Sequence, residues 1–250
     1  MTSANRQIYI GTSGWSYDWW REIFYPSDLP KTRWLSFYAS RFRTVEVNNS
    51  FYRLPSRTVF EKWSRSVGDG FLFAVKASRY ITHTKKLKEP VEPWSRLLEA
   101  TSGLGNKLGP ILFEFQPSWR KNYERLADFL KILPEGLDYA FEFRHPSWFA
   151  RDTYDLLAGK GASLVIADSP RFPRVFEETS DLIFVRFHGG RLLYGSEYSD
   201  RELAWWARFM LDAERRGKRI FAYFNNDAFG FAPKNAAQLE SLLLGEEKAA

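Results

Sequence analysis

The sequence predicts a single α/β domain built as a TIM-like (β/α)8 barrel of eight parallel strands. Short apolar runs alternate with segments of helical periodicity, as in parallel α/β folds, and eight such runs occur. The length of 250 residues suits one barrel and is too short for two. We expect residues 1–250 to form one domain, with a polar N-terminal arm at residues 1–6 and a C-terminal tail at residues 246–250.

The eight apolar runs are the predicted strands, because each is short and bounded by turn or helix signals. They span residues 8–11, 44–48, 71–76, 111–116, 139–144, 164–168, 182–188 and 220–225. An open, doubly wound sheet is the structural alternative. The first strand, however, is not followed by the Gly-x-Gly-x-x-Gly pattern of dinucleotide-binding folds.

The segments between the strands carry helix start and stop signals. Pro93 opens a run that stops at Gly103, and Ser199 with Glu202 forms a capping box before a long helix. Residues 169–180 contain two prolines and little periodicity. We therefore expect the sixth helix to be short or missing.

The composition limits the chemistry and the partners of the chain. Cysteine is absent, which excludes disulfides, thiolate nucleophiles and cysteine-ligated metals. The polar start and the lack of a long apolar run predict a cytoplasmic protein with no membrane partner. The formal charge of +6 favours a small anionic ligand, with nucleic acid as an alternative partner.

Alternation within the strands predicts which side chains point into the barrel. In the second strand Val45 and Val47 share one face and Glu46 the other, and we expect the apolar face to contact the helices. The same reasoning places these ionisable residues inside the barrel near the strand ends: Glu46, Lys76, Glu114, Glu142, Arg144, Asp168, Arg186 and His188. Barrel enzymes keep their catalytic residues at the strand ends. The pattern favours a functional pocket over the alternative, a structural ion-pair network.

The leading hypothesis is an enzyme that acts on a small phosphorylated or carboxylated substrate by acid–base chemistry. The predicted catalytic groups are Glu46, Glu142, Asp168 and His188. Lys76, Arg144 and Arg186 are predicted to hold the anion. Gly189 and Asn225 follow the seventh and eighth strands, where barrels often bind phosphate.

Two alternative functions remain open. The first is hydrolysis of phosphodiesters or nucleic acid with a divalent metal, because all three histidines follow or end predicted strands. The candidate metal ligands are His145, His188, Glu142 and Asp168. No His-x-His or His-Glu-x-x-His spacing occurs. The second is a non-catalytic protein that binds nucleic acid through aromatic loops.

Three ordered motifs resemble those of a known family. They are Gly-Thr-Ser-Gly-Trp at residues 11–15, Val-Glu-Val-Asn-Asn-Ser-Phe-Tyr at 45–52 and Glu-Phe-Arg-His-Pro-Ser-Trp at 142–148. With these motifs the chain resembles the YecE-like family (domain of unknown function 72) over nearly its whole length. The resemblance implies a TIM-like barrel and brings no established reaction.

The resemblance also implies site residues. It adds Trp15, Asn48 and Tyr52 to the predicted substrate-binding residues and includes His145 among the site positions. At the level of the barrel only, the family is similar to xylose-isomerase-like barrels. These include a metal-dependent nuclease that acts at abasic DNA, which keeps the metal and nucleic-acid alternatives open.

Overall fold

The strands of the computed structural model form two parallel sheets within the described residues, 6–249, with the side chains of the last helix described to residue 245. One sheet has the order β1-β9-β8-β7 and the other the order β2-β3-β4-β5-β6. Every pair of neighbours is parallel. The strands are β1 Ile8–Thr12, β2 Thr44–Val47, β3 Leu72–Lys76, β4 Leu108–Glu114, β5 Tyr139–Glu142, β6 Ser163–Leu164, β7 Ile166–Asp168, β8 Leu182–Phe187 and β9 Arg219–Phe224.

The two sheets contact each other at two places, between β1 and β2 and between β6 and β8. β6 and β7 are two parts of the predicted sixth strand, separated by Val165; β6 pairs with β5 and β7 with β8. At the other junction Ser13 forms an isolated bridge with Glu46. A Cβ on Gly11 would lie 2.2 Å from the carbonyl oxygen of Thr44, so β1 and β2 run directly beside each other. The arrangement is TIM-like, and each predicted strand is present.

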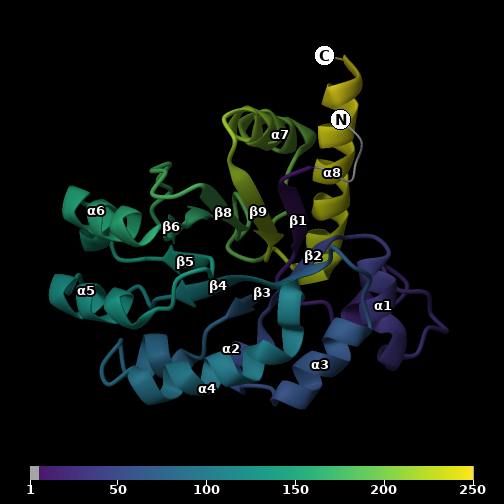
Figure 1. Ribbon diagram of the computed structural model, residues 1–250. Coiled ribbons are helices and arrows are strands. Elements are labelled where there is room, and N and C mark those ends of the chain that lie inside the picture. Colours follow the sequence, from purple (N-terminus) through teal and green to yellow (C-terminus); the bar gives the residue numbers. More distant parts are fainter. Residues whose placement is uncertain (1–5, 250) are drawn as a thin grey trace.

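The helices lie on the outside of the strands (Figure 1). They are α1 Trp34–Ala39, α2 Asn49–Tyr52, α3 Arg57–Arg65, α4 Val91–Thr101, α5 Tyr123–Ile132, α6 Arg151–Lys160, α7 Asp200–Arg215 and α8 Phe231–Ala249. The capping box predicted at Ser199 and Glu202 opens α7. Residues 169–181, all described, contain no helix, so the missing sixth helix is confirmed.

The chain ends differ in part from the prediction. Helix α8 continues to Ala249, so residues 246–249 belong to this helix and do not form a separate tail. The arm predicted at residues 1–6 falls almost wholly on residues 1–5, which lie outside the described residues, as does residue 250. Among the helices of the described chain, none is long and apolar enough to cross a membrane.

Two apolar layers hold the strands in place. Outward-facing strand residues such as Val45 and Phe141 pack against the helices in a large core. A smaller cluster, which includes Leu112 and Phe184, fills the space enclosed by the strands. Toward the C-terminal ends of the strands the inward-facing residues become polar. The apolar layers therefore form a rigid base beneath a polar cluster.

Candidate active site

The predicted inward-facing ionisable residues converge at the strand ends, with the exception of Asp168. The converging residues are Glu46, Lys76, Glu114, Glu142, Arg144, Arg186 and His188, each of them at most slightly exposed. They come from β2, β3, β4, β5 and β8, or from the residues directly after these strands. We call this set the strand-end cluster. Alternation placed these side chains correctly because both faces of a buried parallel strand must be filled.

Arg186 lies at the centre of the strand-end cluster and is 0% exposed. Its Nε and Nη2 donate to the two oxygens of Glu46, each at 2.8 Å. Its Nη1 donates to Glu114 at 2.6 Å and to Glu142 at 2.5 Å. A fully enclosed guanidinium whose nitrogens all face carboxylates has no face left for a substrate. The structure therefore contradicts the prediction that Arg186 clamps the ligand; it holds the carboxylates together.

The upper part of the cluster pairs Glu114 with two further cations. Lys76 Nζ and Arg144 Nη2 each lie 2.9 Å from Glu114 Oε2, and Arg144 Nε donates to Glu142 Oε1 at 2.7 Å. Three carboxylates thus face three cations. Such pairing offsets much of the desolvation cost of burying the charges.

The cations keep Glu114 and Glu142 ionised. Burial by itself raises the pKa of Glu142, but Arg144, Arg186 and His188 together lower it well below the usual range. At Glu114, too, burial raises the pKa. Lys76 and Arg144 lower it by more, so the pKa of Glu114 lies below its usual value. A carboxylate that stays charged at every ordinary pH is a poor proton carrier. These two glutamates act as fixed negative charges.

Burial favours the neutral form of His188, and its contacts define the tautomer of that form. Burial lowers its pKa despite the nearby Glu142. The amide nitrogen of Asn225 lies 3.3 Å from His188 Nδ1, and His188 Nε2 lies 3.2 Å from Glu142 Oε1. Since an amide nitrogen can only donate, Nδ1 accepts and Nε2 carries the proton that it donates to Glu142. His188 thereby links Asn225 to the cluster.

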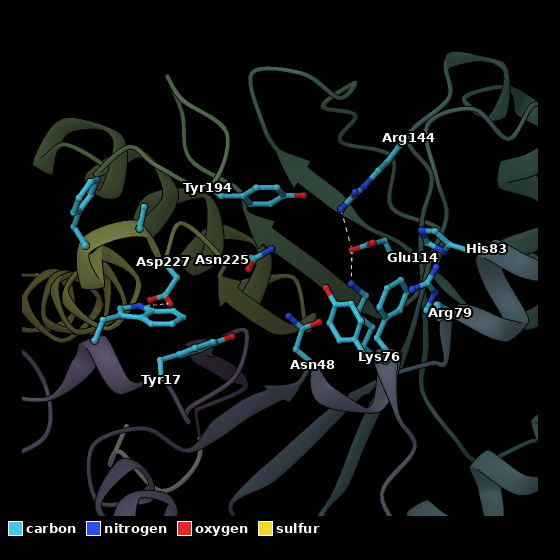
Figure 2. Close-up of a pocket in the computed structure, with 15 residues that line it drawn as sticks. Tyr17, Asn48, Lys76, Arg79, His83, Glu114, Arg144, Tyr194, Asn225 and Asp227 are labelled. Atoms are coloured by element: carbon cyan, nitrogen blue, oxygen red, sulfur yellow. Dashed lines mark hydrogen bonds and ion pairs between the residues drawn. The ribbon is translucent and has the colours of Figure 1, made fainter. Parts of the chain in front are cut away.

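A pocket of about 820 Å³ opens above the cluster. Figure 2 shows Lys76, Glu114 and Arg144 on one side of this pocket and Tyr17 with Asp227 on the other. The pocket is lined by Tyr17, Trp19, Asn48, Phe51, Tyr52, Lys76, Arg79, His83, Glu114, Arg144, Tyr194, Asn225, Asp227, Ala228 and Phe229. All of these follow or end strands, as expected for a site on this fold.

Asp227 is the titratable group of the wall opposite the cations. Its two oxygens accept hydrogen bonds from the indole nitrogens of Trp19, at 2.9 Å, and Trp20, at 2.6 Å. Burial raises the pKa of Asp227 to about 6, although both indoles favour its charged form. The ring of Tyr17 lies 4.8 Å from that of Trp19. A carboxyl group that titrates close to neutral pH is suited to accept and return a proton.

The predicted site residues fall into three groups. Five line the pocket: Asn48, Tyr52, Lys76, Arg144 and Asn225. Four lie fully buried beneath it: Glu46, Glu142, Arg186 and His188. The others lie elsewhere: Trp15, Gly189, His145 and Asp168. Prediction from the sequence thus pointed to the part of the fold where the pocket lies. It did not distinguish the residues that line the pocket from those buried beneath it.

Trp15 and Gly189 have internal contacts that explain their positions. The ring of Trp15 packs edge-on against Trp63, with centroids 4.9 Å apart, as part of the core. The amide of Gly189 donates to the hydroxyl of Tyr198 at 3.1 Å. This amide is therefore already used and does not face an anion. The backbone φ of 95° at Gly189 explains the glycine as a turn residue.

The prediction that Asp168 points into the barrel is wrong. Its side chain faces the helix layer, where it pairs with Arg174 at 2.7 Å and accepts from the indole of Trp206, in α7, at 3.2 Å. The predicted sixth strand is apolar on both faces except at its end, so alternation had no polar face to follow. Asp168 has the same parity as Leu164 and Ile166, which pack outward.

The four predicted metal ligands do not come together. His145 Nδ1 accepts from the backbone amide of Ser147 and caps a short helical turn, and Asp168 faces the helix layer. Glu142 is occupied by two arginines and His188. Within residues 6–249 no group of three or more histidine, aspartate or glutamate side chains could hold a metal ion. The residues of this site therefore do not fit a metal.

Several pocket residues are not among the predicted catalytic and substrate-binding residues. Tyr17, Arg79, His83, Tyr194 and Asp227 all come from the segments that follow the strands. Strand alternation does not extend into loops, whose paths depend on contacts made far along the chain. Two of them carried a signal. Asp227 ends an Asn-Asn-Asp run directly after the last strand, and His83 is one of the three histidines that follow or end predicted strands.

Comparison with known proteins gives one consistent family. Residues 9–250 match the family model described as "Protein of unknown function DUF72". The UPF0759 protein YunF of Bacillus subtilis is 28% identical over 94% of each chain. The UPF0759 protein YecE of Escherichia coli K12 is 29% identical over 65% of this chain and 59% of its own length. The resemblance seen in the motifs is thereby confirmed.

Solved structures agree with these matches. A DUF72 family protein from Thermotoga maritima is 30% identical, with a TM-score of 0.85 over 96% of this chain and 100% of its own. A DUF72 family protein from Enterococcus faecalis is 24% identical, with a TM-score of 0.80 over 95% of each chain. The second of these shows the fold alone.

Proposed function

Since the chain belongs to the DUF72 family of proteins of unknown function, we propose its function from the pocket itself: it is an enzyme that binds a small phosphorylated or carboxylated substrate and transfers a proton to or from it. The observation that carries this proposal is that cations and a carboxyl group lie on opposite walls of the pocket. Lys76, Arg79 and Arg144 line one part of the pocket and Asp227 another. Cations can hold an anionic group in a fixed place while a nearby carboxyl group moves a proton.

Lys76, Arg79 and Arg144 are the proposed anion-binding residues. Lys76 and Arg144 also pair with Glu114, which fixes their positions. Lys76 Nζ lies 4.0 Å from the centre of the Phe51 ring, and the guanidinium of Arg144 lies 4.3 Å from that of Phe172. These rings hold the cations without neutralising them. Arg79 is exposed and contributes a third charge.

Asp227 is the proposed proton carrier, in place of the buried Glu46, Glu142 and His188. With a pKa of about 6 it is mostly ionised at neutral pH and is ready to accept a proton. The proposed role of the buried residues is to position the site. Glu142 orients Arg144 and His188, and His188 in turn orients Asn225.

We also infer that the two sheets act as one closed barrel, which keeps these walls at a fixed separation. The bridge between Ser13 and Glu46 and the hydrogen bond from Val165 N to Phe141 O, at 3.0 Å, support this inference. A binding protein for nucleic acid would also use a basic, aromatic surface. The enzyme proposal is favoured because the cations and Asp227 line a concave pocket rather than an open face.

The anion site is tested by titrating wild type and Arg79→Gln with a set of phosphorylated and carboxylated metabolites, using isothermal titration calorimetry. Arg79 is exposed, so its replacement should leave the stability unchanged. We expect about tenfold weaker binding, because one charge-assisted hydrogen bond is lost. Arg65→Gln, an exposed arginine at the end of α3, is the control and should bind as wild type does. If wild type binds no compound of the set at millimolar concentration, the proposal is wrong.

Turnover of any bound compound is then followed by nuclear magnetic resonance in wild type and Asp227→Asn. The variant should retain binding and lose turnover by at least a hundredfold, because general acid–base groups contribute about 10²–10⁴-fold. Unchanged turnover would remove Asp227 from the mechanism.

A further inference from the structure

Three large aromatic side chains stand exposed around the mouth of the pocket. Trp19 is 53% exposed, Tyr52 70% and Phe229 77%, and all three line the pocket. Exposed rings contribute little to folding, because their apolar surface stays in water. Single exposed rings are common on protein surfaces, whereas several around one pocket indicate a binding surface.

The three rings come from separate segments of the chain. Trp19 lies in a short turn at Asp18–Trp20 after β1, Tyr52 ends α2, and Phe229 lies in a turn at Ala228–Gly230 after β9. Two of them are held despite their exposure: Trp19 Nε1 donates to Asp227, and Tyr52 packs edge-on against Phe51 at 5.1 Å. Loops that are distant in sequence therefore bring pre-positioned rings to one opening.

Phe229 also adopts an unfavourable backbone conformation. Its φ is 64°, in the left-handed region that a bulky residue rarely occupies, at a cost of order 1 kcal/mol. Ala228 N donates to Tyr194 O at 3.1 Å and holds the turn in place. Gly230 N donates to Asp227 O at 3.2 Å, so hydrogen bonds of the turn hold this conformation. The ring of Phe229 contacts that of Phe231, with centroids 5.9 Å apart, and stays largely exposed at the pocket.

Deeper in the pocket, two polar atoms lack hydrogen-bond partners. Asn48 Oδ1 is buried and accepts no hydrogen bond. Arg144 Nη2 lies beside Glu114 Oε2 but makes no hydrogen bond of acceptable geometry. Figure 2 shows both side chains at the pocket. A buried acceptor without a partner costs about 1–3 kcal/mol, so a donor on a ligand would satisfy Asn48 Oδ1, whereas Arg144 Nη2 already lies 2.9 Å from the carboxylate of Glu114.

We propose that the ligand is an anionic compound that also carries a flat heteroaromatic ring, with its anionic group at Lys76, Arg79 and Arg144 and its ring stacked on Tyr52, Trp19 and Phe229. This inference rests on the proposed function and adds the substrate class. The order of the two parts follows from burial, since Lys76 and Arg144 are almost fully buried while the aromatic rings are exposed. The pocket volume of about 820 Å³ lies in the range of small-molecule binding sites.

The test compares ring-bearing and ring-free compounds of the same charge by isothermal titration calorimetry. The phosphates are inorganic phosphate, ribose 5-phosphate and nucleoside 5′-monophosphates. The carboxylates are acetate, succinate, nicotinate and orotate. Stacking of a ring on aromatic side chains contributes about 1–3 kcal/mol, so in at least one series the ring should tighten binding about tenfold or more.

Two variants identify the rings responsible. Tyr52→Ala removes an exposed ring, and Phe229→Gly removes another while relieving the left-handed backbone, so neither should unfold the protein. Each variant should lose most of the affinity that the ring of the ligand adds. The affinity for ring-free anions should stay unchanged. Tyr123→Ala, an exposed tyrosine at the start of α5 that does not line the pocket, is the control.

The outcomes separate this inference from the proposed function. If ring-free anions bind, Arg79→Gln weakens them and the ring adds nothing, the anion site stands and the ring inference is wrong. If the ring adds affinity but both variants keep it, the assignment of Tyr52 and Phe229 is wrong. If no anion of either series binds, both proposals fail.

Discussion

Arg186 shows how a charged residue can serve a site without touching a substrate. It binds three carboxylates at distances of 2.5–2.8 Å, and one of these, Glu114, contacts the pocket cations Lys76 and Arg144. A change at Arg186 is therefore transmitted to the pocket through Glu114. The residue positions the site and stabilises the fold at once.

Replacement of Arg186 by methionine should destabilise the protein by about 3–5 kcal/mol, because three buried carboxylates lose their shared cation. The free energy of unfolding in urea, measured at pH 7, checks this. Arg215→Met, at an exposed position near the end of α7, should change the stability by less than about 0.5 kcal/mol. A loss below about 1 kcal/mol for Arg186→Met would show that the carboxylates find other partners.

At the scale of elements, the close approach of β1 and β2 depends on one glycine. A Cβ on Gly11 would lie 2.2 Å from Thr44 O and 3.0 Å from the Tyr38 hydroxyl. Neither group can retreat easily, because Thr44 belongs to a buried strand and Tyr38 is fully buried. The junction of the two sheets therefore tolerates no side chain here.

Gly11→Ala should thus cost at least about 1–3 kcal/mol, as expected for overpacking of a buried contact. Thermal unfolding followed by circular dichroism measures it. Gly159→Ala is the matched control, because Gly159 lies inside α6 with open space around its Cβ position. That change should raise the stability by about 0.5–1 kcal/mol. Equal effects of the two substitutions would contradict the close contact between β1 and β2.

The strands were predictable from the sequence, and the loops were not. Alternation identified the strand-end cluster because its strands carry polar side chains on one face and apolar side chains on the other. In β2, for example, Glu46 lies on the face opposite Val45 and Val47. It failed at Asp168, which follows an apolar stretch with no polar face. It could not reach Asp227, because a loop conformation depends on tertiary contacts, here the indoles of Trp19 and Trp20.

At the scale of the whole molecule, α8 buries an acidic residue against the first strand. Glu240 lines a small hollow with Arg6, Arg43 and Ile8. Burial raises the pKa of Glu240 to about 7, although Arg43 and Arg6 act in the opposite direction. In the unfolded chain this carboxyl ionises near its usual pKa of about 4.3. The folded state therefore holds the proton more tightly.

This difference makes the stability depend on pH. Between about pH 4.3 and 7 the unfolded state binds fewer protons, so the contribution of Glu240 falls as the pH rises. We expect Glu240→Gln to resemble wild type at pH 4 and to be more stable by about 2–4 kcal/mol at pH 8, because each unit by which the pKa is raised corresponds to about 1.4 kcal/mol. Urea unfolding across this range, with Glu99→Gln as a control at an exposed position in α4, checks the sign. A difference between Glu240→Gln and wild type that does not change with pH would contradict the assignment.

The pairing of the first strand with the last has a consequence for synthesis on the ribosome. β1 pairs along its whole length with β9 and makes only a bridge to β2. The strands β2 to β6 pair in chain order, so this sheet can assemble while the chain is still emerging. β1 is made before β9, so it lacks its sheet partner until β9 has left the exit tunnel. The sheet β1-β9-β8-β7 therefore assembles only after β9 has emerged.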